Sequence, residues 1–264
     1  MFKELSVEVW RGLRLLFSKP SSIMINIITA PLWLAFFILT LRGFGVLTLG
    51  KFTIQLFLWA AYAFALYSSW LWGGFGNGGV IEEGYEGILE NVMATVNNLL
   101  THVIGWGGIA YSIYTLLDLA ALAISFYIVF GLIMDIKDPV LLVISIILAS
   151  LQLLFISTIY AMLVIRLRSN WVITDIMQFL MPALGGLIPS ETSKYIMIMN
   201  EYSPIAYPFI IMREAALGYL ELPIPITYQV LYSSITVASL FIITAMLVKV
   251  FDKRLREEGK LGLT

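Results

Sequence analysis

Six long apolar segments constrain what this chain can fold into more than any other feature. They lie at about residues 21–41, 53–77, 103–133, 140–165, 171–188 and 227–249. Each is near or above the ~20 residues that a helix needs to cross the hydrocarbon core of a bilayer. Only helices and closed barrels satisfy their backbone polar groups in lipid, and a barrel would show short alternating segments instead. We therefore expect an all-α integral membrane protein with six transmembrane helices, forming a single transmembrane domain over residues 1–264.

The composition agrees with a membrane protein and excludes several kinds of chemistry. Charged residues make up 12% of the chain, about half of what a soluble domain carries. Cysteine is absent and His102 is the one histidine, so thiol catalysis and a multi-histidine metal site cannot be built within one chain. No nucleophile–base pair or paired carboxylate suggests an active site. We expect a protein that is not an enzyme, and we interpret His102 as a residue of the membrane interface.

The first nineteen residues predict a helix that lies on the membrane surface. On a helix, apolar side chains such as Phe2, Leu5 and Val9 fall on one side, and Arg11 and Arg14 fall on the other. This pattern is typical of an interfacial amphipathic helix. The charges are spread through the segment, which argues against a cleaved signal peptide.

Lysine and arginine near the ends of the spans predict the orientation. With the N-terminus in the cytoplasm, eleven of these residues are inside and five are outside. The positive-inside rule then places both termini in the cytoplasm of a multi-pass protein of the cell membrane. Residues 250–264 become a charged cytoplasmic tail.

Residues 82–98 form a polar interruption that carries Glu82, Glu83, Glu86 and Glu90 but no lysine or arginine. Three of these glutamates recur every four residues, so a helix would align them on one face. The segment predicts a short amphipathic cytoplasmic helix with an acidic edge. A solvated loop that joins two spans is the alternative interpretation.

Residues 189–226 form the one long loop on the predicted outer side. Ser203–Pro204 divides it into two apolar halves, at about 191–201 and 205–217, that are too short to span. Ser190 is a plausible helix N-cap and Gly218 a plausible helix end. We expect an extracellular helical hairpin that is re-entrant or lies on the outer surface, before the last span.

Polar residues inside the spans indicate a water-accessible path or a seam between helices, and the sequence leaves both open. They gather on the second and fifth spans. These residues are Gln55, Tyr62, Ser68, Ser69, Thr174, Asp175 and Gln178. Asp118, near the middle of the third span, is either a proton or cation site or a buried carboxyl group bonded to its neighbours.

A partial nucleotide motif does not predict a nucleotide site. Gly45 to Lys51 match the first seven positions of a P-loop, but Phe52 stands where Ser or Thr must hold Mg²⁺. We expect no cofactor or metal in this chain.

Two local motifs, together with the order of these segments, resemble the permease subunits of ABC-2 type transporters. In the acidic segment, Gly87 and Glu90, followed by Ala94–Thr95, match the family's Gly-Thr-Leu-Glu core and its spacing. In the hairpin, Ser203-Pro204-Ile-Ala-Tyr207, then Arg213 and Gly218, match the spacing of a second family motif. The resemblance covers nearly the whole chain.

The resemblance implies a partner and a role for each segment. Such permeases pair as homodimers or related heterodimers and bind two copies of an ATPase subunit, which holds the ATP and Mg²⁺. Residues 82–98 would be the coupling helix, seated in the ATPase through Glu82, Glu83, Glu86, Gly87 and Glu90. The path would be lined largely by the second and fifth spans, and the hairpin would form an outer gate that includes Pro204, Tyr207 and Arg213.

The expected function is therefore ATP-driven export of a hydrophobic, amphipathic or lipid-like small molecule across the bilayer, with no role for nucleic acid. An ion-coupled secondary transporter or channel is the alternative. It would work through Asp118 and Asp175 without an ATPase.

Overall fold

The computed structural model describes residues 2–18, 21, 24, 28, 50–74, 79–85, 99–131, 133–167, 173, 176–177, 181–182 and 184–258. Within these ranges every regular element is a helix and no strand occurs. The fold is therefore all-α, as the apolar segments predict.

Four helices are long and apolar enough to cross a membrane: Lys51–Leu71, Val103–Ile124, Pro139–Leu167 and Ile226–Phe251. They correspond to the second, third, fourth and sixth predicted spans; the last two agree to within two residues, and the first two end six and nine residues before the predicted ends. The first predicted span lies almost wholly outside the described residues, and so does much of the fifth. Four apolar helices support a membrane protein, and six spans stay a prediction.

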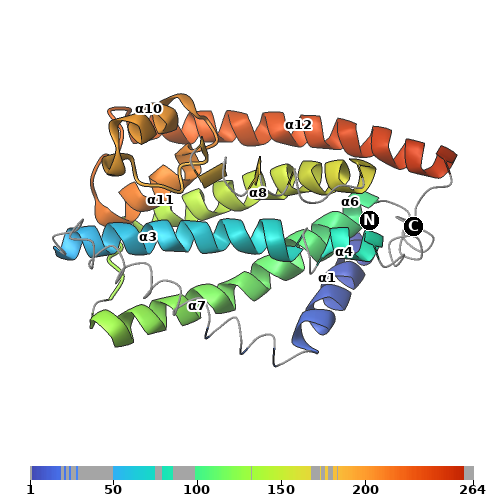
Figure 1. Cartoon of the computed structure of the whole chain (residues 1–264), viewed down its shortest axis with the longest axis horizontal. Helices are drawn as coiled ribbons and strands as arrows, with labels where there is room; N and C mark the ends of the chain where they lie inside the picture. Colours follow the sequence, from blue (N-terminus) through green and yellow to red (C-terminus); the bar gives the residue numbers. More distant parts are fainter. Residues whose placement is uncertain are drawn as a thin grey trace.

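The long helices run side by side (Figure 1). The second span is α3 (Lys51–Ser68), continued by the π-helix η1 (Ser69–Gly74). The third predicted span begins with the π-helix η2 (Val103–Ala110), which follows the short helix α6 (Leu99–His102), and continues as α7 (Tyr111–Phe130). The fourth is α8 (Pro139–Leu167) and the last is α12 (Ile226–Glu258). Helix α12 thus extends beyond the predicted span into the tail.

Short helices lie at the two ends of these long ones (Figure 1). The end that we call the N-terminal end holds α1 (Phe2–Phe17), α4 (Val80–Tyr85) and α6, beside the C-terminal part of α12. The other end, the hairpin end, holds η3 (Ser190–Thr192), α10 (Lys194–Tyr202) and α11 (Tyr207–Leu217). Helix α1, the predicted interfacial helix, and the start of the acidic segment therefore share one end, and the predicted hairpin occupies the other.

The core is built where α8 packs against α11 and α12. Buried aromatic and aliphatic side chains such as Trp59, Tyr67, Leu153, Tyr160 and Phe209 fill it. Tyr67 on α3 donates a 2.6 Å hydrogen bond to the backbone carbonyl of Met177. Because Met177 belongs to the fifth predicted span, this bond places that part of the chain beside α3.

Two π-helical stretches flank the acidic segment, with η1 before it and η2 after it. π-Helices are rare, usually last a single turn, and are common at functional sites. Their wider turns give the backbone an alternative to the α-helical hydrogen-bond pattern. The acidic segment and α6 therefore lie between two π-helical stretches.

Candidate functional site

A buried cluster of charged side chains ties together the elements at the N-terminal end. Its members are Glu8 and Arg11 of α1, Glu83 of α4 and His102 of α6, which we call the histidine cluster. The His102 side chain is fully buried, with Nδ1 2.7 Å from a carboxylate oxygen of Glu8 and Nε2 2.7 Å from one of Glu83. Arg11 donates from Nη1 to Glu8 at 3.1 Å and from Nη2 to Glu83 at 2.5 Å. The imidazole ring of His102 therefore connects α6 to both α1 and α4.

The geometry assigns the charge of the histidine cluster. A neutral imidazole has one N–H, so it cannot donate to carboxylates at both ring nitrogens, whereas the doubly protonated ring can. Burial alone would lower the pKa of His102, but the hydrogen bonds and charges of Glu8 and Glu83 raise it overall. Burial likewise acts to raise the pKa of Glu8, and His102 and Arg11 lower it overall. Two cations then balance two anions.

Glycines let α1 approach η2 closely enough to form the histidine cluster. A Cβ added to Gly12 would lie 2.5 Å from the Trp106 ring and 2.7 Å from the Ala110 Cβ. A Cβ added to Gly105 would lie 2.6 Å from the Cβ of Glu8. Small residues at helix contacts allow this kind of close backbone approach.

The acidic segment is described at its start only. Glu82 and Glu83 lie in α4, where Glu82 is exposed and Glu83 is buried in the histidine cluster. Adjacent residues on a helix point in different directions, so one carboxylate faces outward while its neighbour binds α1. Glu86, Gly87 and Glu90 lie outside the described residues, as does the predicted helix beyond Tyr85.

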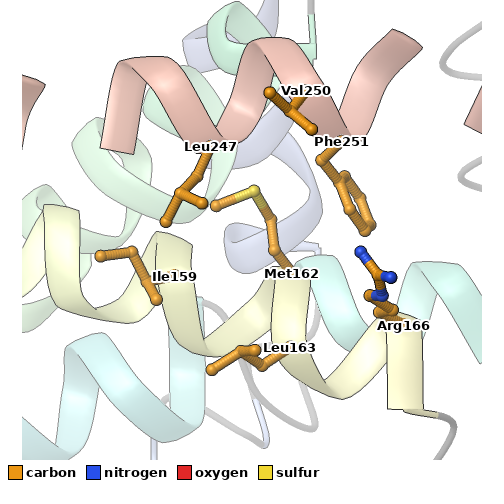
Figure 2. Close-up of a pocket in the computed structure, with 7 residues that line it drawn as sticks. All are labelled: Ile159, Met162, Leu163, Arg166, Leu247, Val250 and Phe251. Atoms are coloured by element: carbon orange, nitrogen blue, oxygen red, sulfur yellow. The ribbon is translucent and has the colours of Figure 1, made fainter. Parts of the chain in front are cut away.

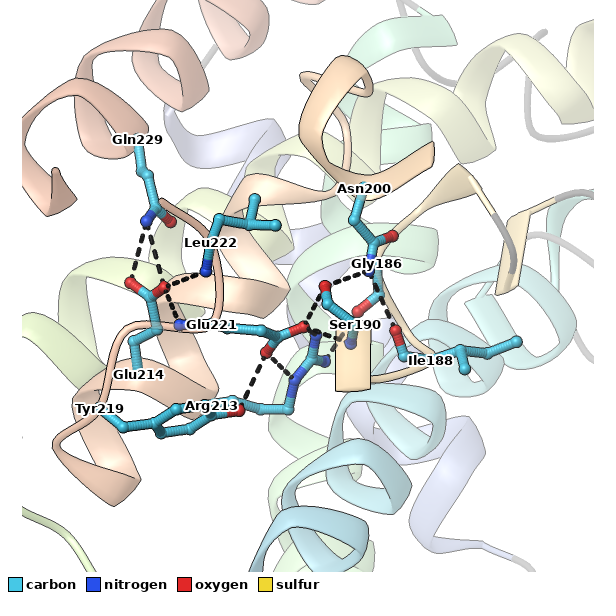
Figure 3. Close-up of polar contacts among 10 residues, drawn as sticks. All are labelled: Gly186, Ile188, Ser190, Asn200, Arg213, Glu214, Tyr219, Glu221, Leu222 and Gln229. Carbon is cyan, nitrogen blue, oxygen red and sulfur yellow. Dashed lines mark hydrogen bonds and ion pairs between the residues drawn. The ribbon is translucent and has the colours of Figure 1, made fainter. Parts of the chain in front are cut away.

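A second buried cluster lies at the hairpin end (Figure 3). We call it the hairpin cluster, and its members are Ser190, Arg213, Glu214, Glu221 and Gln229. The fully buried guanidinium of Arg213 donates to both carboxylate oxygens of Glu221, from Nε and Nη2, each at 2.7 Å. Its Nη1 donates to the carbonyl of Gly186 at 2.7 Å. The backbone N–H and hydroxyl of Ser190 also donate to Glu221, both at 2.8 Å. Burial acts to raise the pKa of Glu221, but the charge and hydrogen bonds of Arg213 lower it overall.

Glu214 extends this hairpin cluster to the start of α12. Its carboxylate accepts the backbone N–H of Glu221 at 2.7 Å and both its oxygens accept Nε2 of Gln229, at 3.2 and 3.0 Å. Burial raises the pKa of Glu214, and the nearby charge of Glu221 raises it further. The hydrogen bonds from Gln229 and from the backbone lower it, but the pKa stays raised overall. The loop after α11 is thereby fastened to α11 on one side and to α12 on the other.

The hairpin has the two halves that the sequence predicts, with a break at Ser203–Pro204. Gly218 ends α11 with a left-handed backbone (φ 69°), as predicted. The prediction for Ser190 is wrong, because Ser193 is the N-cap of α10 and accepts the N–H of Tyr195. Ser190 binds Glu221 instead.

Of the predicted gate residues, Arg213 is the centre of the hairpin cluster and Tyr207 lies at the start of α11. The Tyr207 hydroxyl donates to the carbonyl of Glu201 at 2.6 Å, and its ring stacks on Tyr232 of α12. Pro204 is exposed in the turn between the two halves. Pro204 and Tyr207 thus shape the turn, and Arg213 holds the loop after it.

Three of the predicted path residues, Gln55, Tyr62 and Ser69, are among the described residues, all on the second predicted span. Gln55 is buried and clamps the loop before α8, donating to the carbonyl of Ile133 at 2.7 Å and accepting from the N–H of Asp135 at 3.2 Å. Tyr62 packs on Trp59, and Ser69 begins η1. Thr174, Asp175 and Gln178 lie outside the described residues. The polar side chain of Gln55 therefore joins α3 to the loop before α8.

Neither buried cluster is arranged for metal binding. Among the residues that the structure describes, no group of three or more His, Asp or Glu side chains could hold a metal ion. Asp118 lies on α7, and its side chain is outside the described set.

No known family, curated protein or solved structure matches the chain.

Proposed function

We propose that this chain is the permease subunit of an ATP-binding cassette exporter of the ABC-2 type. Two such subunits would pair, and ATP hydrolysis in a separate subunit would move a hydrophobic or amphipathic molecule outward. The observation that carries the proposal is the histidine cluster, which joins the N-terminal helix, the start of the acidic segment and the third span in one buried unit.

A permease of this kind needs a cytoplasmic element whose displacement reaches the membrane helices. Glu83 binds α1 through Arg11 and α6 through His102, so a force on α4 acts on α6 and, through it, on the third span. The π-helical stretches η1 and η2 are the places where these spans can bend. Glu82, which is exposed, and the remaining glutamates of the segment would be the contacts to the ATPase.

The hairpin cluster would hold the predicted outer element rigid. A buried Arg–Glu pair with every Glu221 oxygen bonded holds one geometry, and Lys137 and Asp138 donate their backbone N–H groups to the last carbonyls of α11. A hairpin fastened in this way would move as one body with α11, α8 and α12. That behaviour fits a gate that opens by displacement of whole helices.

Charge reversal at the acidic segment tests the proposal. The chain is co-expressed with an ATPase encoded beside it and purified in detergent, as wild type and with Glu86→Lys and Glu90→Lys together. We expect the wild type to retain the ATPase and the double variant to lose at least tenfold of it. The matched control is Glu201→Lys on α10 at the hairpin end, which should retain the ATPase.

Two outcomes would contradict the proposal. One is equal retention of the ATPase by the wild type and by the double variant. The other is a wild type that binds no ATPase while its transport follows an ion gradient, which would favour the ion-coupled alternative through Asp118.

A further inference from the structure

An apolar hollow lies between α8 and α12 at the N-terminal end (Figure 2). Its volume is about 100 Å³. Helix α8 contributes Ile159, Met162 and Leu163, and α12 contributes Leu247, Val250 and Phe251. All six side chains are apolar, so this wall suits a hydrocarbon chain and not a polar ligand.

Arg166 is the one charged side chain of the hollow and lies at its edge. Its guanidinium points toward the side of the hollow where Phe251 lies (Figure 2). The Arg166 side chain is exposed, and it has no hydrogen bond or ion pair with any residue that the structure describes. The guanidinium group has five N–H donors that match a phosphate group, so these donors are available to a ligand.

The position of Arg166 along α8 sets the depth of the site. Helix α8 has 29 residues and is therefore about 43 Å long, close to the thickness of a bilayer with its headgroups. Arg166 is its penultimate residue, which places the guanidinium among the headgroups. Met162 and Leu247 lie deeper, where the acyl chains begin.

We propose that this hollow binds one anionic phospholipid, with its phosphodiester on Arg166 and part of an acyl chain against Met162, Leu247 and Phe251. Basic pockets between membrane helices recognise anionic headgroups in this way. With both termini in the cytoplasm, the lipid belongs to the inner leaflet.

Native mass spectrometry of the full chain in detergent tests this site. The protein is titrated with dioleoyl phosphatidylglycerol and, separately, with dioleoyl phosphatidylcholine. We expect the first phosphatidylglycerol to bind at least about fivefold more tightly than phosphatidylcholine, the factor that one basic residue near an anionic lipid supplies. Arg166→Gln should remove this preference, and Arg166→Lys should keep most of it.

Two further variants separate a built site from diffuse surface charge. Lys249 is exposed on α12 and does not line the hollow, so Lys249→Gln should leave the preference unchanged. Leu247→Trp should fill the hollow and weaken the binding of both lipids. Equal affinity of the wild type for the two lipids would overturn the proposal, and so would an equal loss in Arg166→Gln and Lys249→Gln.

Discussion

Arg213 and Glu221 show how much a single buried pair constrains this protein. Neither side chain has contact with solvent. A charge in such a place is costly unless a partner and hydrogen bonds surround it. Removing one partner therefore lowers the free energy of unfolding by more than the pair as a whole contributes, because the other charge is left buried without a partner.

We expect Arg213→Met to destabilise the protein by about 3–5 kcal/mol, measured as the free energy of unfolding in a reversible detergent titration. Glu221→Leu should have a similar cost. The double variant should be more stable than either single variant, because no unpaired charge remains. Costs that simply add in the double variant would contradict a coupled pair.

A pH dependence follows from the raised pKa of His102 and the lowered pKa of Glu8. A raised pKa of the folded histidine contributes stability that is fully present below its ordinary value of about 6.5 and is lost as the pH rises through the raised value. The lowered pKa of Glu8 contributes stability that is lost as the pH falls through that lowered value. The histidine cluster is therefore most stabilising between these two limits.

His102→Gln should cost about 3 kcal/mol or more at pH 6, because two buried carboxylates are left with Arg11 alone. The difference from the wild type should shrink as the pH rises from about 6.5 toward the raised pKa of His102, which unfolding titrations between pH 5.5 and 9 would detect. A constant difference across this range would contradict a raised pKa of His102 in the folded protein.

These two clusters also mark the limit of prediction from the sequence at this scale. Hydropathy places His102 at the membrane boundary, but its partner Glu8 lies 94 residues away and no local pattern links them. Arg213 stands out as a cation in an apolar hairpin, and Glu221 is eight residues further on. Two opposite charges within one apolar segment could have predicted that pair from the sequence.

At the scale of elements, hydropathy and the residues that start or end helices predict most of the helices that the structure describes. The predicted spans 140–165 and 227–249 lie within α8 and α12. Ser203–Pro204 marks the break between α10 and α11 because the residue before a proline disfavours the helical conformation. Apolar periodicity does not reveal the π-helical stretches or the packing of α1 on η2, because both depend on tertiary contacts.

The contact of α1 with η2 depends on Gly105, and Gly105→Leu should displace α1. The added side chain would meet the Cβ of Glu8, whose carboxylate belongs to the histidine cluster. We expect hydrogen exchange in the α1 amides to accelerate at least tenfold, while α8 and α11 stay protected. Gly50→Leu is the matched control, since nothing lies within 4 Å of a Cβ at Gly50. Unchanged protection of α1 in Gly105→Leu would contradict this packing.

At the scale of the whole molecule, each end of the fold has its own buried cluster that joins several helices. The histidine cluster joins α1, α4 and α6 at the N-terminal end, and the hairpin cluster joins α11 to α12 at the other. Helices α8 and α12 connect the two ends and run about 40–50 Å by their residue counts. In the proposed exporter, a displacement that begins at the acidic segment reaches the hairpin through these rigid helices.

The mass of the purified complex tests the central claim most directly. The 29.6 kDa chain is co-expressed with its neighbouring ATPase, purified in detergent and measured by native mass spectrometry with and without ATP. We expect a complex of two permease subunits and two ATPase subunits that persists with ATP. A chain that purifies without any ATPase in several detergents, and transports with an ion gradient alone, would contradict it.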